Sequence, residues 1–330
     1  MRGIRCAALT LAGIVACASP PAPAPAPAPD GFDVQGHRGA RGLLPENTLP
    51  GFARALELGV TTLEIDVGVS RDGVVLAHHD PWVHPEVCFA PGGVRIEAER
   101  GPLLRDLDAA ALRAYDCGSL NPDPAAFPEP PRESRPGAPM PTLGEILDLV
   151  AARRGSARLN VEIKAVPVEV SGEPLTLPLE EMVDATLAVL RRAGAIERAT
   201  LQSFDWRVLA LAKQREPRLR TVGLVSPHNL GPAWLGGLDP AAHPDFLALL
   251  RAAPHVDEVS PWWRMLVPGE FALGVEVSAL RAAGYRVVPW TVNDRETMRA
   301  MLELGVDGLI TDYPDRLLDE VRRAGLRVAD

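Results

Sequence analysis

Apolar and polar positions alternate along residues 32–325 in two rhythms, short apolar runs and longer stretches with an apolar residue every three or four positions. Such runs are typical of buried strands, and the longer period is typical of helices that bury one face. "TLPGFARALELG", "PLEEMVDATLAVLRRAG" and "DWRVLALAKQRE" have the helical period. The alternation predicts a parallel α/β fold, most simply a TIM-type (β/α)8 barrel over 32–325. The predicted strands are 33–37, 60–67, 74–79, 158–164, 198–203, 219–225, 256–260, 286–292 and 307–311.

Nine strand candidates compete for eight places in the barrel. The link from 67 to 74 is too short for a crossover helix between parallel strands, so one strand in this region is irregular. The pattern does not tell which candidate lies outside the barrel. Residues 81–141 form a Pro-rich insertion, within which "RDLDAAALRAYDCG" predicts a short helix, and "PTLGEILDLV" resumes the regular pattern.

The N-terminal segment has the features of an export signal. Residues 1–16 carry two arginines before an apolar run that is too short to span a bilayer. The tetrapeptide that ends at Cys17 resembles a bacterial lipobox, which implies cleavage before Cys17 and lipidation of its sulfur; ordinary cleavage near Ala16 or Ala18 is the alternative. Residues 17–31 are rich in Pro and Ala and predict a semi-rigid tether. We therefore expect an exported, membrane-anchored lipoprotein that faces the periplasm or the cell exterior and reaches the membrane only through its lipid.

The formal net charge of −9, without a basic stripe, argues against a nucleic-acid partner. An anionic substrate must instead be held by a local cluster of positive charge.

Carboxylates gather on two predicted strands. Side chains alternate faces along a strand, so Glu64 and Asp66 of "TTLEIDVGV" share one face. In "ARLNVEIKAV" the same rule places Asn160, Glu162 and Lys164 together. Three carboxylates without a thiolate favour one divalent cation, Mg²⁺ or Ca²⁺, as cofactor.

Two histidines stand near strand ends with cations beside them. His37 and Arg38 occur in "VQGHRGARGLLPENT", and His79 ends "DGVVLAHH". Strand C-termini converge on one face of such a barrel, so these groups are expected to meet the carboxylates. His37 and His79 can then act as general base and acid on a phosphodiester, while Arg38 and Lys164 hold its oxygens. Glycines on either side of the His-Arg pair are expected to let a substrate approach the backbone.

Seven segments, in order, resemble the successive motifs of the glycerophosphodiester phosphodiesterase family: "HRGARGLLPENT", "LEIDV", "VVLAHHD", "NVEIK", "LQSFD", "VPWTVN" and "GVDGLITDYPD". The resemblance implies a barrel enzyme that uses a divalent metal to hydrolyse a small glycerophosphodiester to an alcohol and glycerol 3-phosphate. By motif, it assigns His37 and His79 as the acid-base pair, and Glu64, Asp66 and Glu162 as metal ligands. It also implies that Arg38 and Lys164 contact phosphate and that Glu46 orients Arg38 or His37.

Several alternatives stay open at this point. Trp290 either lines the glycerol pocket or belongs to the core, and Trp262 and Trp263 are weaker candidates for the same rim. His78 precedes His79, but on a strand it faces the other way, so the role goes to His79. The main alternative function is hydrolysis of lipid phosphodiesters, of phospholipase-D or sphingomyelinase-D type. A non-catalytic binding lipoprotein and a glycosidase account for fewer of these residues.

The chain contains four cysteines. Cys6 is removed with the signal segment, and Cys17 is committed to lipid if the lipobox is used. Cys88 and Cys117 remain, both in the insertion of an exported chain, and they predict a disulfide; two free thiols are the alternative.

Overall fold

The computed structural model describes residues 30–120, 132–153 and 155–329. The predicted signal segment 1–16, the lipidation residue Cys17 and the tether up to residue 29 lie outside the described residues.

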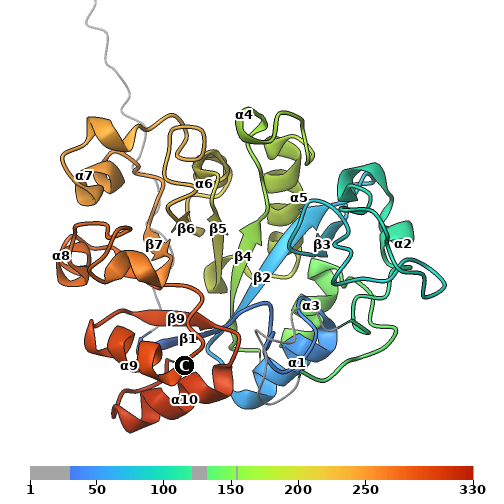
Figure 1. Ribbon diagram of the computed structural model, residues 1–330, viewed down its shortest axis with the longest axis horizontal. Coiled ribbons are helices and arrows are strands. Elements are labelled where there is room, and N and C mark those ends of the chain that lie inside the picture. Colours follow the sequence, from blue (N-terminus) through green and yellow to red (C-terminus); the bar gives the residue numbers. More distant parts are fainter. Residues whose placement is uncertain (1–29, 121–131, 154, 330) are drawn as a thin grey trace, which may run out of the picture.

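Eight parallel strands form a barrel, shown in Figure 1. Their order is β8-β7-β6-β5-β4-β2-β1-β9. The first and last strands are joined by backbone hydrogen bonds, from Asp307 N–H to the Val287 carbonyl (2.9 Å) and from Ile310 N–H to the Pro289 carbonyl (3.0 Å). The predicted TIM-type barrel is confirmed. Its strands are β1 (Asp33–Gly36), β2 (Thr62–Val69), β4 (Arg158–Ile163), β5 (Ala199–Ser203), β6 (Arg220–Val225), β7 (Glu258–Pro261), β8 (Arg286–Val287) and β9 (Gly308–Thr311).

The ninth candidate is β3 (Val75–Ala77), which lies outside the barrel. It pairs antiparallel with the end of β2, with Val67 opposite Ala77. The turn between them is closed by the Ser70 N–H, which donates to the Val74 carbonyl, and Gly73 adopts a positive φ of 77°. A hairpin is therefore the physical reason for the short link.

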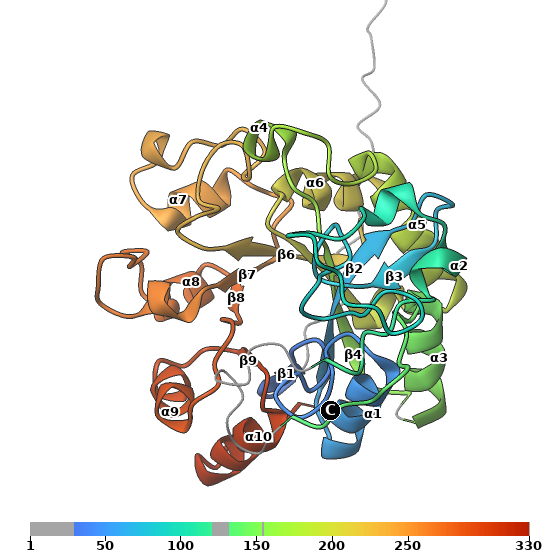
Figure 2. The same ribbon diagram turned by 45° about the vertical axis from the view of Figure 1, so that its right-hand side comes forward.

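Helices surround the barrel in Figures 1 and 2. Outward-facing residues of β2, such as Leu63, Ile65 and Val67, are fully buried in the apolar layer beneath them. The helices are α1 (Leu49–Leu58), α2 (Ala109–Leu112), α3 (Leu143–Arg153), α4 (Val168–Ser171), α5 (Leu179–Arg192), α6 (Trp206–Arg215), α7 (Phe246–Arg251), α8 (Val277–Ala282), α9 (Arg295–Glu303) and α10 (Pro314–Arg323). Short 3₁₀ turns occur at Leu104–Asp106, Ile196–Arg198, Pro240–Ala242 and Trp263–Leu266. Among the described residues no helix has the length and apolar character needed to cross a membrane.

Polar side chains fill the inside of the barrel. Asn160 of β4 donates a hydrogen bond to Gln35 of β1, although β2 lies between these strands. At the amino ends of the strands, Glu258 accepts from Arg220 at 2.7 Å. The polar interior explains why each strand is buried on both faces yet carries alternating polar residues.

The described part of the insertion packs beside β3, to the right in Figure 1, and has a small core of its own. This core includes Leu76, Val83, Leu104 and Leu112. Cys88 and Cys117 are joined by a disulfide within it, which confirms the predicted pairing. The helix predicted here is short, only Ala109–Leu112.

Candidate active site

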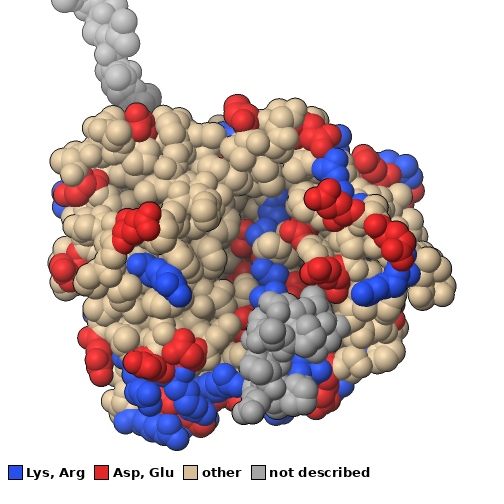
Figure 3. Space-filling model, in the orientation of Figure 1, with Lys and Arg blue, Asp and Glu red and all other residues tan. Residues whose placement is uncertain are grey.

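A cavity of about 240 Å³ opens at the carboxyl ends of the barrel strands. Figure 3 views this end of the molecule, where acidic and basic atoms lie in the central hollow. The cavity is lined by His37, Arg38, Arg41, Glu64, His79, Glu162, Lys164, Gln202, Phe204, Leu224, Trp290, Thr291 and Ile310. The barrel thus brings together both predicted histidines, two of the three predicted carboxylates and both predicted cations at the cavity wall.

The third carboxylate, Asp66, lies immediately beneath this wall. One carboxylate oxygen from each of Glu64, Asp66 and Glu162 lies within 4.8 Å of the others, and all three side chains are buried. Burial and the neighbouring carboxylates raise the pKa of Glu64 well above its ordinary value. Burial, helped by Asp66 and opposed by Lys164, raises the pKa of Glu162 to about 7. A cluster of oxygens that repel each other in this way fits a hard divalent cation.

Two cations partly neutralise the cluster. The Arg38 Nε lies 2.9 Å from Asp66 Oδ2, and the Lys164 Nζ lies 2.6 Å from Glu162 Oε1. Although burial opposes its ionisation, Arg38 and Lys164 lower the pKa of Asp66. Asn47 also donates to Asp66 at 3.0 Å, so this carboxylate is held ionised and fixed.

The turn that carries Arg38 has an unusual backbone. Arg38 adopts a φ of 50°, a left-handed conformation uncommon for a residue with a side chain. Its N–H donates to Glu64 Oε2 at 2.9 Å. A Cβ at Gly36 would collide with the Gly39 carbonyl, and one at Gly39 would lie 2.7 Å from the Gly51 carbonyl carbon. Packing against the turn itself at Gly36 and against helix α1 at Gly39 therefore requires glycine at both positions. The predicted approach of a substrate to this backbone stays a prediction.

Glu46 lies between two arginines. Its Oε1 accepts from Arg38 at 2.7 Å and its Oε2 from Arg41 at 2.7 Å. Although burial opposes ionisation, the two guanidinium groups hold the pKa of Glu46 well below its usual range. In the structure, Glu46 is therefore placed to orient Arg38, the first of its two predicted partners.

His37 is held by a carboxylate that the sequence analysis did not single out. Its Nδ1 lies 2.7 Å from Asp312 Oδ1, and its Nε2 lies 4.0 Å from Glu64 Oε2. Asn293 donates to the other oxygen of Asp312 at 2.7 Å. Burial lowers the pKa of His37, whereas the Asp312 carboxylate raises it. The charges of Arg38 and Arg41 add to the effect of burial, so the pKa lies below its ordinary value.

The two adjacent histidines have different surroundings. His79 lines the cavity with 34% of its side chain exposed, and its Nδ1 lies 3.0 Å from Asp80 Oδ1. Burial, followed by the charges of Arg38 and Lys164, lowers the pKa of His79 well below its ordinary value. His78 is buried, and its Nε2 contacts the Trp82 carbonyl at 3.0 Å. The structure thus directs His79, and not His78, toward the cavity.

Aromatic side chains form one wall of the cavity. Trp290 lines it while donating its indole N–H to the Ser260 carbonyl at 2.8 Å. Phe204 meets Trp290 edge-on at 5.5 Å between ring centroids, and the Lys164 Nζ lies 5.7 Å from the centroid of the Phe204 ring. Trp262 and Trp263 are not among the lining residues and pack against the apolar core.

Six residues described above in the site were not predicted to have a role: Arg41, Asn47, Gln202, Phe204, Asn293 and Asp312. Each stands inside a segment that carries the family resemblance, "HRGARGLLPENT", "LQSFD", "VPWTVN" or "GVDGLITDYPD". A polar residue directly before or after an apolar strand run, as at Gln202 and Asp312, was the available signal.

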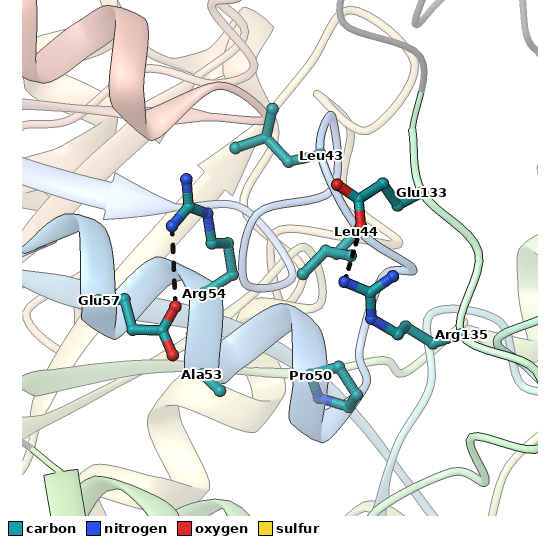
Figure 4. A pocket seen from close by; sticks show the side chains of 8 residues that line it. All are labelled: Leu43, Leu44, Pro50, Ala53, Arg54, Glu57, Glu133 and Arg135. Carbon is teal, nitrogen blue, oxygen red and sulfur yellow. Dashed lines mark hydrogen bonds and ion pairs between the residues drawn. The ribbon is translucent and has the colours of Figure 1, made fainter.

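A second, larger surface cavity of about 480 Å³ lies beside α1 (Figure 4). Two ion pairs border it, Arg54 with Glu57 at 3.7 Å and Arg135 with Glu133 at 2.8 Å. Its described lining residues include no histidine and none of the clustered carboxylates, so its greater size does not make it the candidate site.

Comparison with known proteins agrees with this geometry. Residues 37–316 match the model of the "Glycerophosphoryl diester phosphodiesterase family". A "Glycerophosphodiester phosphodiesterase" of Caldanaerobacter subterraneus subsp. tengcongensis is 27% identical, over 88% of this chain and 97% of that protein.

Two solved structures are similar along most of their length. The crystal structure named "Putative glycerophosphoryl diester phosphodiesterase from Silicibacter pomeroyi" is 31% identical with a TM-score of 0.77, covering 91% of this chain and 96% of that one. An Oleispira antarctica phosphodiesterase in complex with the product sn-glycerol-3-phosphate has the same fold, with 24% identity and a TM-score of 0.64 over 88% of this chain and 97% of that one. Because the family model and the Silicibacter relative both cover most of the chain, this protein belongs to the glycerophosphoryl diester phosphodiesterase family and is a phosphoric diester hydrolase.

Proposed function

We propose that the enzyme hydrolyses small glycerophosphodiesters to an alcohol and glycerol 3-phosphate, with one divalent cation and the acid-base pair His37 and His79. The observation that carries this proposal is the single cavity into which two histidines, two cations and buried carboxylates converge. A phosphodiester is an anion whose cleavage needs charge neutralisation and two proton transfers, and these are the groups that supply both.

Glu64, Asp66 and Glu162 would hold the cation. Their oxygens are close enough to share one ion. Burial, together with the neighbouring carboxylates, raises the pKa of Glu64 and of Glu162. An all-oxygen set favours Mg²⁺ or Ca²⁺. When bound, the cation supplies positive charge at the phosphoryl oxygens.

Arg38 and Lys164 are proposed to bind the phosphate oxygens. Both line the cavity, and Glu46 holds the Arg38 guanidinium in place. Trp290 and Phe204 offer apolar surface on the cavity wall for the carbon atoms of the glycerol group.

His37 is proposed as the base. Asp312 accepts from its Nδ1, which leaves the Nε2 lone pair to take a proton from water, and the carboxylate then stabilises the imidazolium that forms. The water oxygen bonds to phosphorus as the bond from phosphorus to the alcohol oxygen breaks.

His79 is proposed to give its proton to that leaving oxygen. In the free site burial, followed by the charges of Arg38 and Lys164, disfavours the protonated form of His79. A bound phosphate neutralises these two cations, and the pKa of His79 rises toward the range an acid needs.

A substrate panel tests the proposal against its alternative. Purified enzyme with Mg²⁺ or Ca²⁺ is given glycerophosphocholine, glycerophosphoethanolamine, intact phospholipid, sphingomyelin and an aryl phosphodiester, and the products are identified. We expect glycerol 3-phosphate and free alcohol from the water-soluble diesters. The complex of the Oleispira relative with sn-glycerol-3-phosphate supports this expected product. Turnover confined to phospholipid or sphingomyelin would instead establish the lipid phosphodiesterase.

We also propose that the mature chain is an exported lipoprotein anchored through Cys17. The support is the lipobox-like tetrapeptide and the Pro-Ala tether, both in the sequence alone. The wild-type chain should fractionate with membranes and carry lipid on its N-terminal cysteine by mass spectrometry, and Cys17→Ala should abolish both. A wild-type chain recovered only without lipid contradicts the proposal.

A further inference from the structure

A continuous line of side-chain hydrogen bonds crosses the inside of the barrel from the active site to the amino ends of the strands. It joins Glu64, Gln202, Asn160, Gln35 and Asp33, which we call the polar relay. The Gln202 Nε2 donates to Glu64 Oε1 at 2.8 Å, and the Gln202 Oε1 accepts from Asn160 at 2.9 Å. All five side chains are buried.

Asn160 is the centre of the polar relay. Its Nδ2 group donates in two directions, to Gln202 and to Gln35, both at 2.9 Å. Its Oδ1 accepts from the Thr200 hydroxyl at 2.8 Å. Gln35 in turn donates a hydrogen bond from its amide nitrogen to Asp33 Oδ2 at 2.8 Å. The donors therefore run outward from Asn160 to a carboxylate at each end.

This direction of hydrogen bonding fixes how Gln202 faces the active site. If its amide were reversed, its carbonyl would face the Glu64 carboxylate and its amino group would face the Asn160 donor. Both contacts would then be unpaired in a buried site, where unpaired polar groups are costly. Glu64 is thus held from two sides, by Gln202 at Oε1 and by the Arg38 N–H at Oε2.

We propose that Gln202 and Asn160 are positioning residues for the metal site, because they fix the orientation of the Glu64 carboxylate. Asn160 does not line the cavity and acts from beneath it, through its hydrogen bond to Gln202. The inference rests on the proposed function, in which Glu64 is a metal ligand. Residues that orient a ligand in this way typically change metal affinity when they are replaced.

The test is isothermal titration of MgCl₂ and CaCl₂ into chelator-treated protein, with melting temperatures measured in parallel. Gln202→Met and Asn160→Leu interrupt the branch of the polar relay that leads to Glu64. Gln35→Met is the matched control, because it removes a buried amide of the same kind from the branch that leads to Asp33 and leaves Gln202 in place. We expect roughly tenfold weaker metal binding in the first two variants. The control should lose stability but keep the wild-type affinity.

The possible outcomes separate this inference from the proposed function. Wild-type affinity in Gln202→Met overturns the positioning role, and so does an equal loss of affinity in Gln35→Met. A wild-type protein that binds neither Mg²⁺ nor Ca²⁺ overturns the metal site itself and this inference with it. Should Asn160→Leu fail to fold, Gln202→Met decides the question, since it leaves the centre of the polar relay intact.

Discussion

At the scale of single residues, the clearest contrast is between the neighbours His78 and His79. We expect His79→Ala to lower kcat by roughly 100-fold or more with glycerophosphocholine, the usual effect of removing a positioned acid or base. Its melting temperature should change little, because the side chain is partly exposed.

His78→Ala is the control for this prediction. His78 is buried and contacts the Trp82 carbonyl, so its replacement should lower the melting temperature. Its kcat should fall far less than the kcat of His79→Ala. Near-normal turnover in His79→Ala, with turnover lost in His78→Ala, would reverse the assignment.

Glu46 gives a residue-scale prediction that depends on pH. Its carboxylate is buried between Arg38 and Arg41, so Glu46→Gln should destabilise the fold at neutral pH by about 1.5–3 kcal/mol, the scale of a hydrogen bond to a charged group. The pKa of Glu46 is lowered in the folded protein, so the folded state binds fewer protons than the unfolded state. The stabilisation is therefore complete above the unfolded pKa of about 4.5 and is lost as the pH falls below it.

Urea unfolding of both proteins at several pH values measures this effect. The difference in free energy of unfolding between wild type and Glu46→Gln should narrow toward acid pH. Glu57→Gln is the matched control, because Glu57 pairs with Arg153 while half exposed, and such surface pairs contribute little. A difference that widens toward acid pH would contradict the account of Glu46.

At the scale of structural elements, the insertion depends on its disulfide. Cys88 and Cys117 lie in the small core that also holds Leu76 and Val83, residues on either side of His79. The bond closes a loop between residues 29 positions apart, which is worth roughly 3–4 kcal/mol in the chain-entropy model. Reduction should increase hydrogen exchange in the insertion and raise KM before the barrel strands open.

Hydrogen exchange by mass spectrometry, with and without reductant, measures this order of events. The double variant Cys88→Ala, Cys117→Ala should resemble the reduced wild type and not respond to reductant. Strands β4 and β5 opening at the same reductant concentration as the insertion would contradict the prediction.

Element boundaries show where the sequence pattern was informative and where it failed. Alternating apolar runs predicted all nine strands. The pattern is the same in β2 and β3, so it does not distinguish a parallel barrel strand from an antiparallel one. Only the hairpin turn makes β3 run antiparallel to β2. Residues 286–292 were predicted as one strand, yet β8 spans only Arg286–Val287. Pro289 has no N–H to donate, so the ladder is interrupted although its carbonyl still accepts from Ile310.

At the scale of the whole molecule, the barrel explains how distant segments form one site. The two-residue strand period predicted that Glu64 and Asp66 share a face, and the converging strand ends predicted the meeting of His37, Glu162 and Lys164. Asp312 was missed because its role exists only through its contact with His37, 275 positions away in the sequence. Sequence periodicity reports the face of a strand, but it does not report which partner lies across the barrel.

Metal binding should stabilise the whole barrel, and more so at higher pH. Burial and neighbouring charge raise the pKa of Glu64 well above its ordinary value and that of Glu162 from 4.5 to about 7. Without metal, the folded state therefore binds more protons than the unfolded state between about pH 4.5 and pH 7. The apo protein loses stability as the pH rises through this range. A cation replaces those protons, so the gain in melting temperature from MgCl₂ or CaCl₂ should be larger at about pH 8 than at about pH 5.5. Differential scanning calorimetry measures both gains, and a gain that shrinks with rising pH would contradict the ligand assignment.

Metal-dependent hydrolysis of a glycerophosphodiester in this cavity can be measured through its product. Its most direct test measures glycerol 3-phosphate released from glycerophosphocholine by one preparation in three states: as purified with divalent cation, after treatment with EDTA, and after the cation is restored. We expect release in the first state, loss of nearly all turnover in the second and recovery in the third, because Glu64, Asp66 and Glu162 are assigned to the cation. Undiminished release in excess EDTA, or no glycerol 3-phosphate in any state, would contradict this expectation.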